Sequence, residues 1–148
     1  MKILVTGDRC YIGATLVPML RKKYEVIGYD SGYFSENLLE QFDEDYIKIT
    51  KDIRDISRED LEEVDGIIHL AGLSNDPLGE FSPKLTEEIN YSGTIRLAEM
   101  AKDIGVSRFV YASSQSMYGV SDTSNELDED DSEKNPVSAY AISKWKAE

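Results

Sequence analysis

A tyrosine and a lysine one helical turn apart give the strongest chemical signal in the sequence. Tyr140 and Lys144 occupy positions i and i+4 of a segment with helical character, so their side chains share one face of that helix. An ammonium group beside a phenol favours the phenolate and lowers the tyrosine pKa from its usual value of about 10. The pair is therefore suited to general acid–base chemistry near neutral pH. Ser114 follows a predicted strand, where ligands bind in open α/β sheets, and completes the candidate catalytic set.

A second signal lies in the turn between the first predicted strand and the helix after it. Glycines at both ends of this turn allow close backbone approach, and the helix N-terminus favours an anion. We predict a dinucleotide pyrophosphate site formed by Gly7, Arg9, Cys10, Tyr11, Ile12 and Gly13. Asp30 ends the second predicted strand, where it could accept hydrogen bonds from the adenosine ribose or simply form a turn. No arginine follows in residues 31–33 to bind a 2′-phosphate, which favours NAD over NADP.

The elements that would position these residues alternate between short apolar runs and helical patterns. This alternation is typical of βαβ units, and it predicts an α/β fold with a doubly wound parallel sheet. Strands are predicted over 2–6, 25–29, 46–49, 66–70 and 108–112. Helices are predicted over 12–22, 35–42, 57–63, 82–104 and from 138 onward, with Pro18 inside the first. We expect one NAD-binding domain over 1–148, truncated after the fifth strand and within the last helix, and the family resemblance described below implies that its substrate-binding part is absent.

Composition excludes several classes of function. The net charge of −13 and the lack of a basic patch argue against nucleic acid and anionic membranes as partners. There is no secretory signal and no apolar run of about 18 residues, so we expect a cytoplasmic protein. The single cysteine, Cys10, cannot form an internal disulfide, and the single histidine, His69, excludes a multi-histidine metal site. His69 is interpreted as support for a strand end, or alternatively as a ligand contact. The acidic segment 122–133 is either a solvated loop or a mobile lid.

Taken together, these motifs resemble the extended short-chain dehydrogenase/reductase superfamily, in particular its NAD-dependent epimerase/dehydratase branch. The resemblance follows the family pattern in order along the whole chain. The matching residues are Thr6, Gly7, Gly13, Asp30, Asp52, Ile53, His69, Leu70, Ala71, Asn90, Ser113, Ser114, Tyr118, Gly119, Tyr140 and Lys144. Two residues depart from the pattern. Cys10 replaces the middle glycine and is expected to hinder close approach to the pyrophosphate. Asp8 places a negative charge in the loop, which Arg9 would offset.

The resemblance implies a Rossmann-like fold, NAD as cofactor and a nucleotide-sugar substrate that is oxidised at a ring carbon to a keto intermediate. Tyr140 would be the acid and base, Ser114 would hydrogen-bond the reacting sugar group, and Lys144 would hold the nicotinamide ribose. Tyr140 and Lys144 are thus also cofactor contacts. The remaining cofactor contacts implied by the resemblance are Asp52, Ile53, Leu70, Ala71, Gly72 and Asn90. Two copies of the intact enzyme would pair as a homodimer through a bundle that includes the Tyr-Lys helix.

The two positions after Ser114 help to choose among the possible types of reaction. Related 4,6-dehydratases carry Asp-Glu there, whereas this chain has Gln115 and Ser116, so epimerisation or oxidoreduction is favoured over dehydration. Two alternatives stay open. One is a catalytically silent NAD-binding or redox-sensing module, favoured by Asp8 and Cys10. In that module the helix N-terminus would lower the pKa of the Cys10 thiol. The other is a truncated fragment that is inactive by itself.

Overall fold

The computed structural model describes residues 1–34, 45–120 and 126–148. These residues form two compact units. The first unit comprises Met1–Gly72 and Gly93–Ala112, and the second comprises Leu73–Ser92 and Ser113–Glu148. The helix predicted over 35–42 lies outside the described residues.

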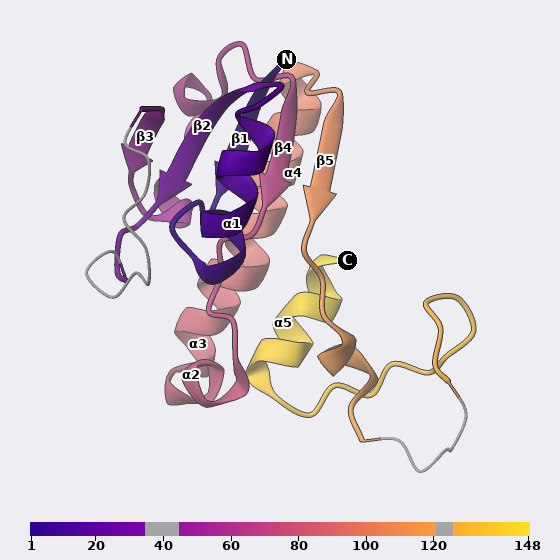
Figure 1. Cartoon of the computed structure of the whole chain (residues 1–148). Coiled ribbons are helices and arrows are strands. Elements are labelled where there is room, and N and C mark those ends of the chain that lie inside the picture. Colours follow the sequence, from indigo (N-terminus) through magenta and orange to yellow (C-terminus); the bar gives the residue numbers. More distant parts are fainter. Residues whose placement is uncertain (35–44, 121–125) are drawn as a thin grey trace. The chain divides into compact units, whose positions relative to one another are not determined.

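The first unit is built on a five-stranded parallel sheet in the order β3-β2-β1-β4-β5 (Figure 1). The strands are β1 (Lys2–Thr6), β2 (Glu25–Asp30), β3 (Ile47–Thr50), β4 (Gly66–His69) and β5 (Arg108–Tyr111). All five lie within one or two residues of their predicted positions. The chain starts in the middle of the sheet, builds one side, and then returns to build the other side from β4. The topology therefore reverses beside β1, which is where doubly wound sheets bind ligands, and the predicted fold class is confirmed.

Two helices cover opposite faces of this sheet, α1 (Tyr11–Leu20) and α4 (Gly93–Ile104) (Figure 1). Under α1, the apolar cluster contains Ile3, Val5, Val17 and Val26. Leu4, Ile67 and Leu97 are also buried. Helix α1 ends at Leu20, two residues earlier than predicted, and contains the expected proline, Pro18. These apolar runs explain why the strand predictions succeed, since strands of a parallel sheet are buried on both faces.

The second unit contains only helical elements and loops in its described part. They are α2 (Asp76–Phe81), α3 (Pro83–Thr86), the π-helical turn η4 (Glu87–Ser92), the 3₁₀ turn η5 (Gln115–Tyr118) and α5 (Ala139–Ala147). The helix predicted over 82–104 is helical without a break from Pro83 to Ile104, but its centre, η4 between α3 and α4, has π rather than α geometry. Helix α2 was not predicted at all. Turns with π geometry occur often at functional sites, and this one carries Asn90.

Two shorter features also differ from expectation. In the first unit, the predicted 57–63 helix is reduced to one 3₁₀ turn, η3 (Glu59–Leu61), and another 3₁₀ turn, η2 (Ile53–Asp55), precedes that range. Ser57 does not cap a helix with its side chain. Instead, its backbone N–H and its hydroxyl both donate to the Asp60 carboxylate, at 3.0 and 3.1 Å. None of the helices in the described part of the chain combines the length and apolarity that a membrane crossing requires.

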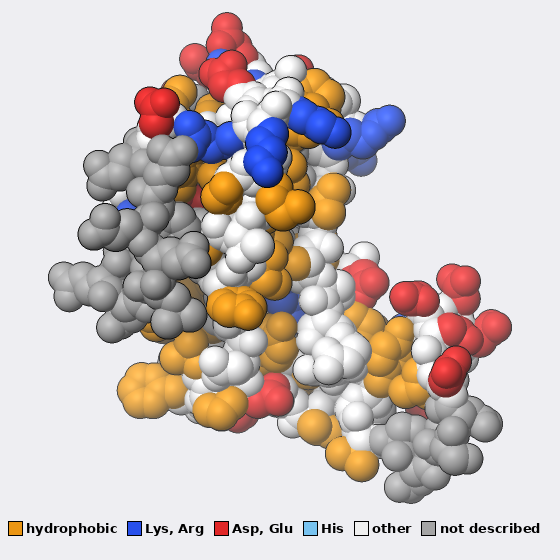
Figure 2. Space-filling view, viewed as in Figure 1, with side chains coloured by type: hydrophobic (Ala, Val, Ile, Leu, Met, Phe, Trp, Pro, Cys, Tyr) orange, Lys and Arg blue, Asp and Glu red, His pale blue; other side chains and the backbone are white. Residues whose placement is uncertain are grey.

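The acidic loop follows η5 in the second unit. Asp and Glu side chains gather on its described part, from residue 126 onward (Figure 2). Its backbone is organised by Asp128, whose carboxylate accepts hydrogen bonds from the N–H groups of Asp130 and Asp131 at 3.1 and 2.7 Å. These bonds hold the pKa of the Asp128 carboxyl below its usual range. The segment 121–125, which includes part of the predicted lid, lies outside the described residues.

Candidate functional site

The loop between β1 and α1 contains a glycine that no other residue can replace without strain. Gly7 has a φ of +74°, and its N–H donates to the Tyr29 carbonyl at 2.8 Å. A Cβ atom at Gly7 would lie 2.8 Å from the backbone nitrogen of Ala71. The Thr6 hydroxyl accepts a hydrogen bond from the same Ala71 N–H at 3.3 Å. The loop is thus fitted closely between the carboxyl ends of β2 and β4.

Cys10 occupies the N-cap of α1, and its conformation explains why glycine is not needed there. Its φ of −83° and ψ of 174° are ordinary extended backbone. The thiol accepts a hydrogen bond from the Gly13 N–H at 3.3 Å, as a serine would in a typical cap. Cys10 therefore occupies the glycine position without backbone strain, and the expected hindrance of the pyrophosphate by its side chain stays a prediction. Burial raises the pKa of the Cys10 thiol, which speaks against the low-pKa thiolate that a redox sensor would need.

Arg9 and Asp30 brace the ends of two strands. The Arg9 guanidinium donates to the Asp30 carbonyl at 2.8 Å and to the Thr50 hydroxyl at 2.9 Å, joining the ends of β2 and β3. The Asp30 carboxylate accepts from the N–H groups of Arg9 and Gly32 at 3.3 and 2.7 Å. Asp30 therefore shapes the turn after β2, as one of its two interpretations expects. Its contact with an adenosine ribose stays a prediction.

The segment after β3 contains two further residues that the resemblance implies as cofactor contacts, Asp52 and Ile53. Asp52 caps η2 and accepts hydrogen bonds from the Arg54 backbone and guanidinium, which hold the pKa of its carboxyl below its usual range. The Asp52 carbonyl accepts from the Tyr29 hydroxyl at 3.1 Å, and the adjacent Ile53 side chain is buried. This packing fixes the chain just beyond the β3 strand end.

His69 has a structural role at the end of β4. Its ring is fully buried and lies between two threonine hydroxyls, Thr6 Oγ1 at 2.5 Å from Nδ1 and Thr94 Oγ1 at 2.8 Å from Nε2. Phe109 and Tyr111 of β5 pack beside it, at ring-centroid distances of 6.1 and 5.9 Å. The ring thus ties β1, β4, β5 and α4 together directly below the segment Leu70, Ala71 and Gly72.

In the second unit, Tyr140 and Lys144 lie one turn apart near the start of α5. Lys144 is only 5% exposed, and burial lowers the pKa of its ammonium group to about 8. Helix α2 packs closely against Tyr140, because a Cβ atom on Gly79 would lie 3.1 Å from the tyrosine Cβ. The start of α5, where Tyr140 lies, is therefore packed closely against α2.

Two carboxylates of α2 hold the N-terminus of α5. Ser138 caps α5 by accepting from the Ala141 N–H at 3.1 Å, and it donates its own hydroxyl hydrogen to Asp76 at 2.5 Å. Glu80 accepts from the Ala139 N–H at 2.6 Å. Negative charge at a helix N-terminus is stabilising, so α2 fixes the position at which Tyr140 enters the helix. Sequence reasoning missed these two residues, although Asn75 before Asp76 and Pro77 is a recognisable helix start.

The cap at Ser138 gives a stability prediction. Ser138→Ala removes an N-cap acceptor and the donor to Asp76, so we expect it to lower the free energy of unfolding by about 1–2 kcal/mol. Urea denaturation measures this loss. Ser82→Ala is the matched control, because Ser82 precedes α3 without any side-chain cap hydrogen bond and should change stability by less than about 0.5 kcal/mol. Equal losses in the two variants would contradict the prediction.

Asn90 links three segments of the second unit. Its carbonyl oxygen accepts from the Leu73 N–H at 2.8 Å, while its amide donates to the Leu73 carbonyl at 3.0 Å and to the Ser143 hydroxyl at 3.2 Å. Ser143 in turn donates to the Tyr140 carbonyl at 2.7 Å. Asn90 is 1% exposed. The side chain predicted as a cofactor contact is thus a buried brace between η4, the segment after β4 and the Tyr-Lys helix.

Ser114 caps η5, where its hydroxyl accepts from the Ser116 N–H at 3.2 Å. This turn packs against α5, the helix that carries Tyr140 and Lys144. The structure thus gathers the three predicted catalytic residues and Asn90 within the second unit. The predicted cofactor residues from Gly7 to Gly72 belong to the first unit, grouped at the carboxyl ends of β1, β2, β3 and β4.

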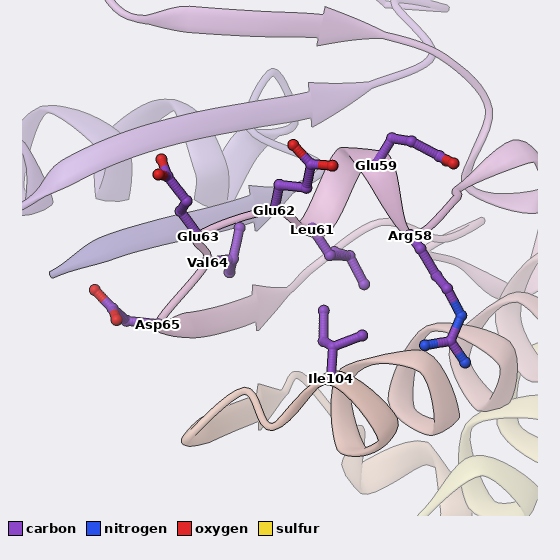
Figure 3. A pocket seen from close by; sticks show the side chains of 8 residues that line it. All are labelled: Arg58, Glu59, Leu61, Glu62, Glu63, Val64, Asp65 and Ile104. Atoms are coloured by element: carbon purple, nitrogen blue, oxygen red, sulfur yellow. The ribbon is translucent and has the colours of Figure 1, made fainter.

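A surface depression of about 510 Å³ lies away from all of these residues (Figure 3). It is found before the start of β4, where Leu61 and Val64 meet Ile104 at the end of α4. Arg58 at its edge pairs with Asp103 at 2.7 Å. Because ligands of doubly wound sheets bind at the carboxyl ends of strands, we do not take this depression as the functional site.

The residues at the carboxyl strand ends fit a dinucleotide on structural grounds. Gly13 lies so close to the loop that a Cβ atom would be 2.2 Å from the Gly7 carbonyl, which leaves the backbone tightly wound around the start of α1. The first N–H groups of a helix have no partner within the helix. Tyr11 and Ile12, at this start, are largely exposed. A helix start of this kind favours binding of a pyrophosphate.

Comparisons with known proteins agree with this geometry. The model of the NAD dependent epimerase/dehydratase family matches residues 3–148. A UDP-glucose 4-epimerase from Mycolicibacterium smegmatis is 34% identical over 154 residues, which cover 97% of this chain and 48% of that protein. A solved UDP-N-acetylglucosamine 4-epimerase from Methanobrevibacter ruminantium M1, in complex with UDP-N-acetylmuramic acid, is 25% identical with a TM-score of 0.87. MoeE5 in complex with UDP-glucose and NAD is 28% identical with a TM-score of 0.82. These two matches cover 99% of this chain and 47% and 46% of theirs, so the chain spans about half the length of these relatives.

Proposed function

Because the chain belongs to the NAD-dependent epimerase/dehydratase family, we propose that it is the cofactor-binding and catalytic part of a nucleotide-sugar epimerase or a related sugar-nucleotide oxidoreductase. NAD is the cofactor of this family. The observation that carries the proposal is the Tyr140–Lys144 pair on one face of α5, a helix held by the Ser138 cap and by the Asn90–Ser143 hydrogen bond. Pairing of two copies and a cytoplasmic location stay predictions.

In this proposal the sugar is oxidised at a ring carbon, and the bound NAD supplies the hydride acceptor. Tyr140 takes the proton of the reacting hydroxyl as oxidation proceeds, and returns it when the keto sugar is reduced. The Lys144 ammonium group would place a positive charge one helical turn from Tyr140 and would hydrogen-bond the nicotinamide ribose. Ser114 donates a hydrogen bond to the same sugar oxygen. Reduction of the keto sugar from its opposite face would give epimerisation without net redox change.

Dehydration has less support than epimerisation. It requires an acid that protonates the leaving hydroxyl, and the two positions after Ser114 carry Gln115 and Ser116 in η5. Neither side chain can supply such a proton near neutral pH. We therefore favour epimerisation or oxidoreduction over dehydration.

The buried lysine gives a pH-dependent prediction for the intact enzyme. The Lys144 pKa of about 8 means that its ammonium charge is present below about pH 8 and is lost as the pH rises through that value. We expect turnover to fall about tenfold per pH unit on this alkaline limb, because a neutral lysine no longer supplies positive charge one turn from Tyr140. Lys144→Arg keeps the charge at high pH, so its limb should move to higher pH. Lys146→Arg is the control on the same helix: Lys146 is exposed and its pKa is raised, so this variant should leave the profile unchanged. An unshifted limb in Lys144→Arg would refute the assignment.

The function is tested with the intact protein that contains this chain. It is incubated with UDP-glucose or UDP-N-acetylglucosamine, and nicotinamide absorbance is followed while products are identified by NMR. Interconversion of the sugar with no net change in absorbance supports epimerisation. A lasting absorbance change supports net oxidoreduction. A protein that binds NAD but changes neither sugar nor absorbance would support the silent module. The chain 1–148 by itself is expected to show no turnover.

A further inference from the structure

The loop between β1 and α1 (Figure 1), where an anion would bind, carries a buried carboxylic acid. Asp8 is 0% exposed. Its Oδ2 accepts a hydrogen bond from the Tyr46 hydroxyl at 2.7 Å. Its Oδ1 has no hydrogen-bond partner among the described residues. Space for the carboxyl group exists only because Gly28 has no side chain, since a Cβ there would lie 2.2 Å from Oδ2.

The carboxyl group lies out of contact with solvent, and its hydrogen-bond donor belongs to an apolar cluster. Tyr46 packs against the cluster of Ile3, Val5, Val17 and Val26 under α1. An ionised carboxylate with one free oxygen is costly in such a place, whereas a protonated one is tolerated. Sequence reasoning expected the Asp8 charge to face the pyrophosphate site and Arg9 to offset it. Instead, the side chain points inward to Tyr46, and the Arg9 guanidinium is hydrogen-bonded to Asp30 and Thr50.

Four titratable groups surround Asp8. Burial is the largest effect and raises the pKa of its carboxyl group. The Tyr46 hydrogen bond and the Arg9 charge oppose that rise, while the Asp30 charge adds to it. The neighbouring Cys10 thiol has a raised pKa and stays neutral. The Tyr46 phenol also has a raised pKa, so it remains a hydrogen-bond donor to Asp8 over the whole physiological range.

We propose that Asp8 and Tyr46 form a buried positioning pair that holds the cofactor loop, and that NAD binds preferentially to the form in which the Asp8 carboxyl group is protonated. The inference rests on the proposed function, because it takes this loop as the pyrophosphate site. A negative charge inside the loop repels a pyrophosphate through a medium of low dielectric, so protonation relieves the repulsion. Binding therefore takes up a proton from solvent, and NAD affinity decreases as the pH rises through the raised Asp8 pKa.

The same group also affects stability without any cofactor. An acid whose pKa is raised in the folded state stabilises the fold while it is protonated. This stabilisation is lost as the pH rises from the unfolded value of about 3.9 through the raised folded value. Asp8→Asn keeps the shape of the side chain and an oxygen that can accept from Tyr46, but it cannot ionise. We expect this variant to be more stable than the wild type at about pH 8, and to lose that advantage toward about pH 4.5.

The test is calorimetric titration of NAD into the wild type and Asp8→Asn between about pH 5 and about pH 8, in two buffers of different ionisation enthalpy. The wild type should bind up to about tenfold more weakly for each pH unit above the Asp8 pKa, with net proton uptake. Asp8→Asn should show a flat profile near the low-pH affinity. Tyr46→Phe removes a hydrogen bond that lowers the Asp8 pKa. The midpoint of the fall in NAD affinity with pH should therefore move to higher pH. If the Asp8–Tyr46 pair were merely structural, both variants would bind NAD more weakly than the wild type. The pH dependence of NAD affinity would then be the same in all three proteins.

Failure of this inference differs from failure of the proposed function. If the wild type and Asp8→Asn bind NAD with the same dependence on pH, the coupling is wrong while the cofactor site stands. If no NAD binds at any pH, the cofactor site and the coupling fail together. If Asp8→Asn does not fold, the midpoint of Tyr46→Phe relative to the wild type decides the matter. An unmoved midpoint then overturns the proposal.

Discussion

Replacing Tyr140 with phenylalanine is expected to lower turnover of the intact enzyme by about 10²–10⁴-fold and to leave NAD affinity nearly unchanged. The substitution removes one hydroxyl group and keeps the ring, so the close packing of α2 against the start of α5 is preserved. Loss of the acid–base group stops proton transfer to and from the sugar. The measurements are initial rates with a nucleotide sugar and a calorimetric titration of NAD.

The control for this prediction is Tyr91→Phe. Tyr91 is also half-buried in the second unit, and its ring interacts with the Lys146 ammonium group at 5.7 Å from the centroid. Removing its hydroxyl should leave both rate and NAD affinity close to those of the wild type. If Tyr140→Phe retained near-normal turnover, the Tyr140–Lys144 pair would not be the acid–base machinery. A parallel loss of NAD affinity would instead indicate that the hydroxyl serves binding.

The sequence predicts the sheet well, because its strands are short apolar runs whose burial needs no distant information. The elements it misses depend on contacts between distant segments. The π-helical η4 is an example. Its Asn90 side chain is hydrogen-bonded to the backbone of Leu73 and to Ser143, and no periodicity in residues 82–104 reports these bonds. Helix α2 could have been predicted from Asn75 and Pro77, but its six residues are too few for a helical apolar pattern.

In the candidate site, too, local features could be predicted from the sequence, whereas features set by distant contacts could not. The chemistry of Tyr140 and Lys144 can be predicted because their spacing is local, whereas the buried position that lowers the Lys144 pKa is set by the fold. The two departures from the family pattern were correctly singled out, but their consequences were not predictable. Cys10 has an extended backbone that tolerates a side chain. Asp8 is turned toward Tyr46, which lies 38 residues away along the chain. The direction of a side chain in a loop depends on what packs against it.

The tight fit of the cofactor loop leads to the second large effect. Gly13→Ala should lower the free energy of unfolding by about 3 kcal/mol or more and abolish NAD binding. The added Cβ would lie 2.2 Å from the Gly7 carbonyl oxygen and 2.7 Å from the Asp8 carbonyl oxygen. Both neighbours are backbone atoms. Gly7 is itself fixed by its hydrogen bond to Tyr29 and by Ala71, so relief requires that α1 move away from the sheet.

Urea denaturation measures the loss, and Gly66→Ala in β4 provides the matched control. A Cβ at Gly66 would meet only Arg108, at 3.7 Å, which is an ordinary van der Waals contact. Because alanine has less conformational entropy to lose than glycine, this variant should be neutral or more stable by up to about 1 kcal/mol. The two substitutions add the same methyl group to buried glycines of the same unit, so their difference isolates the contact with the loop. A Gly13→Ala protein as stable as Gly66→Ala would mean that the loop is free to move, and a preorganised pyrophosphate site would then have no structural basis.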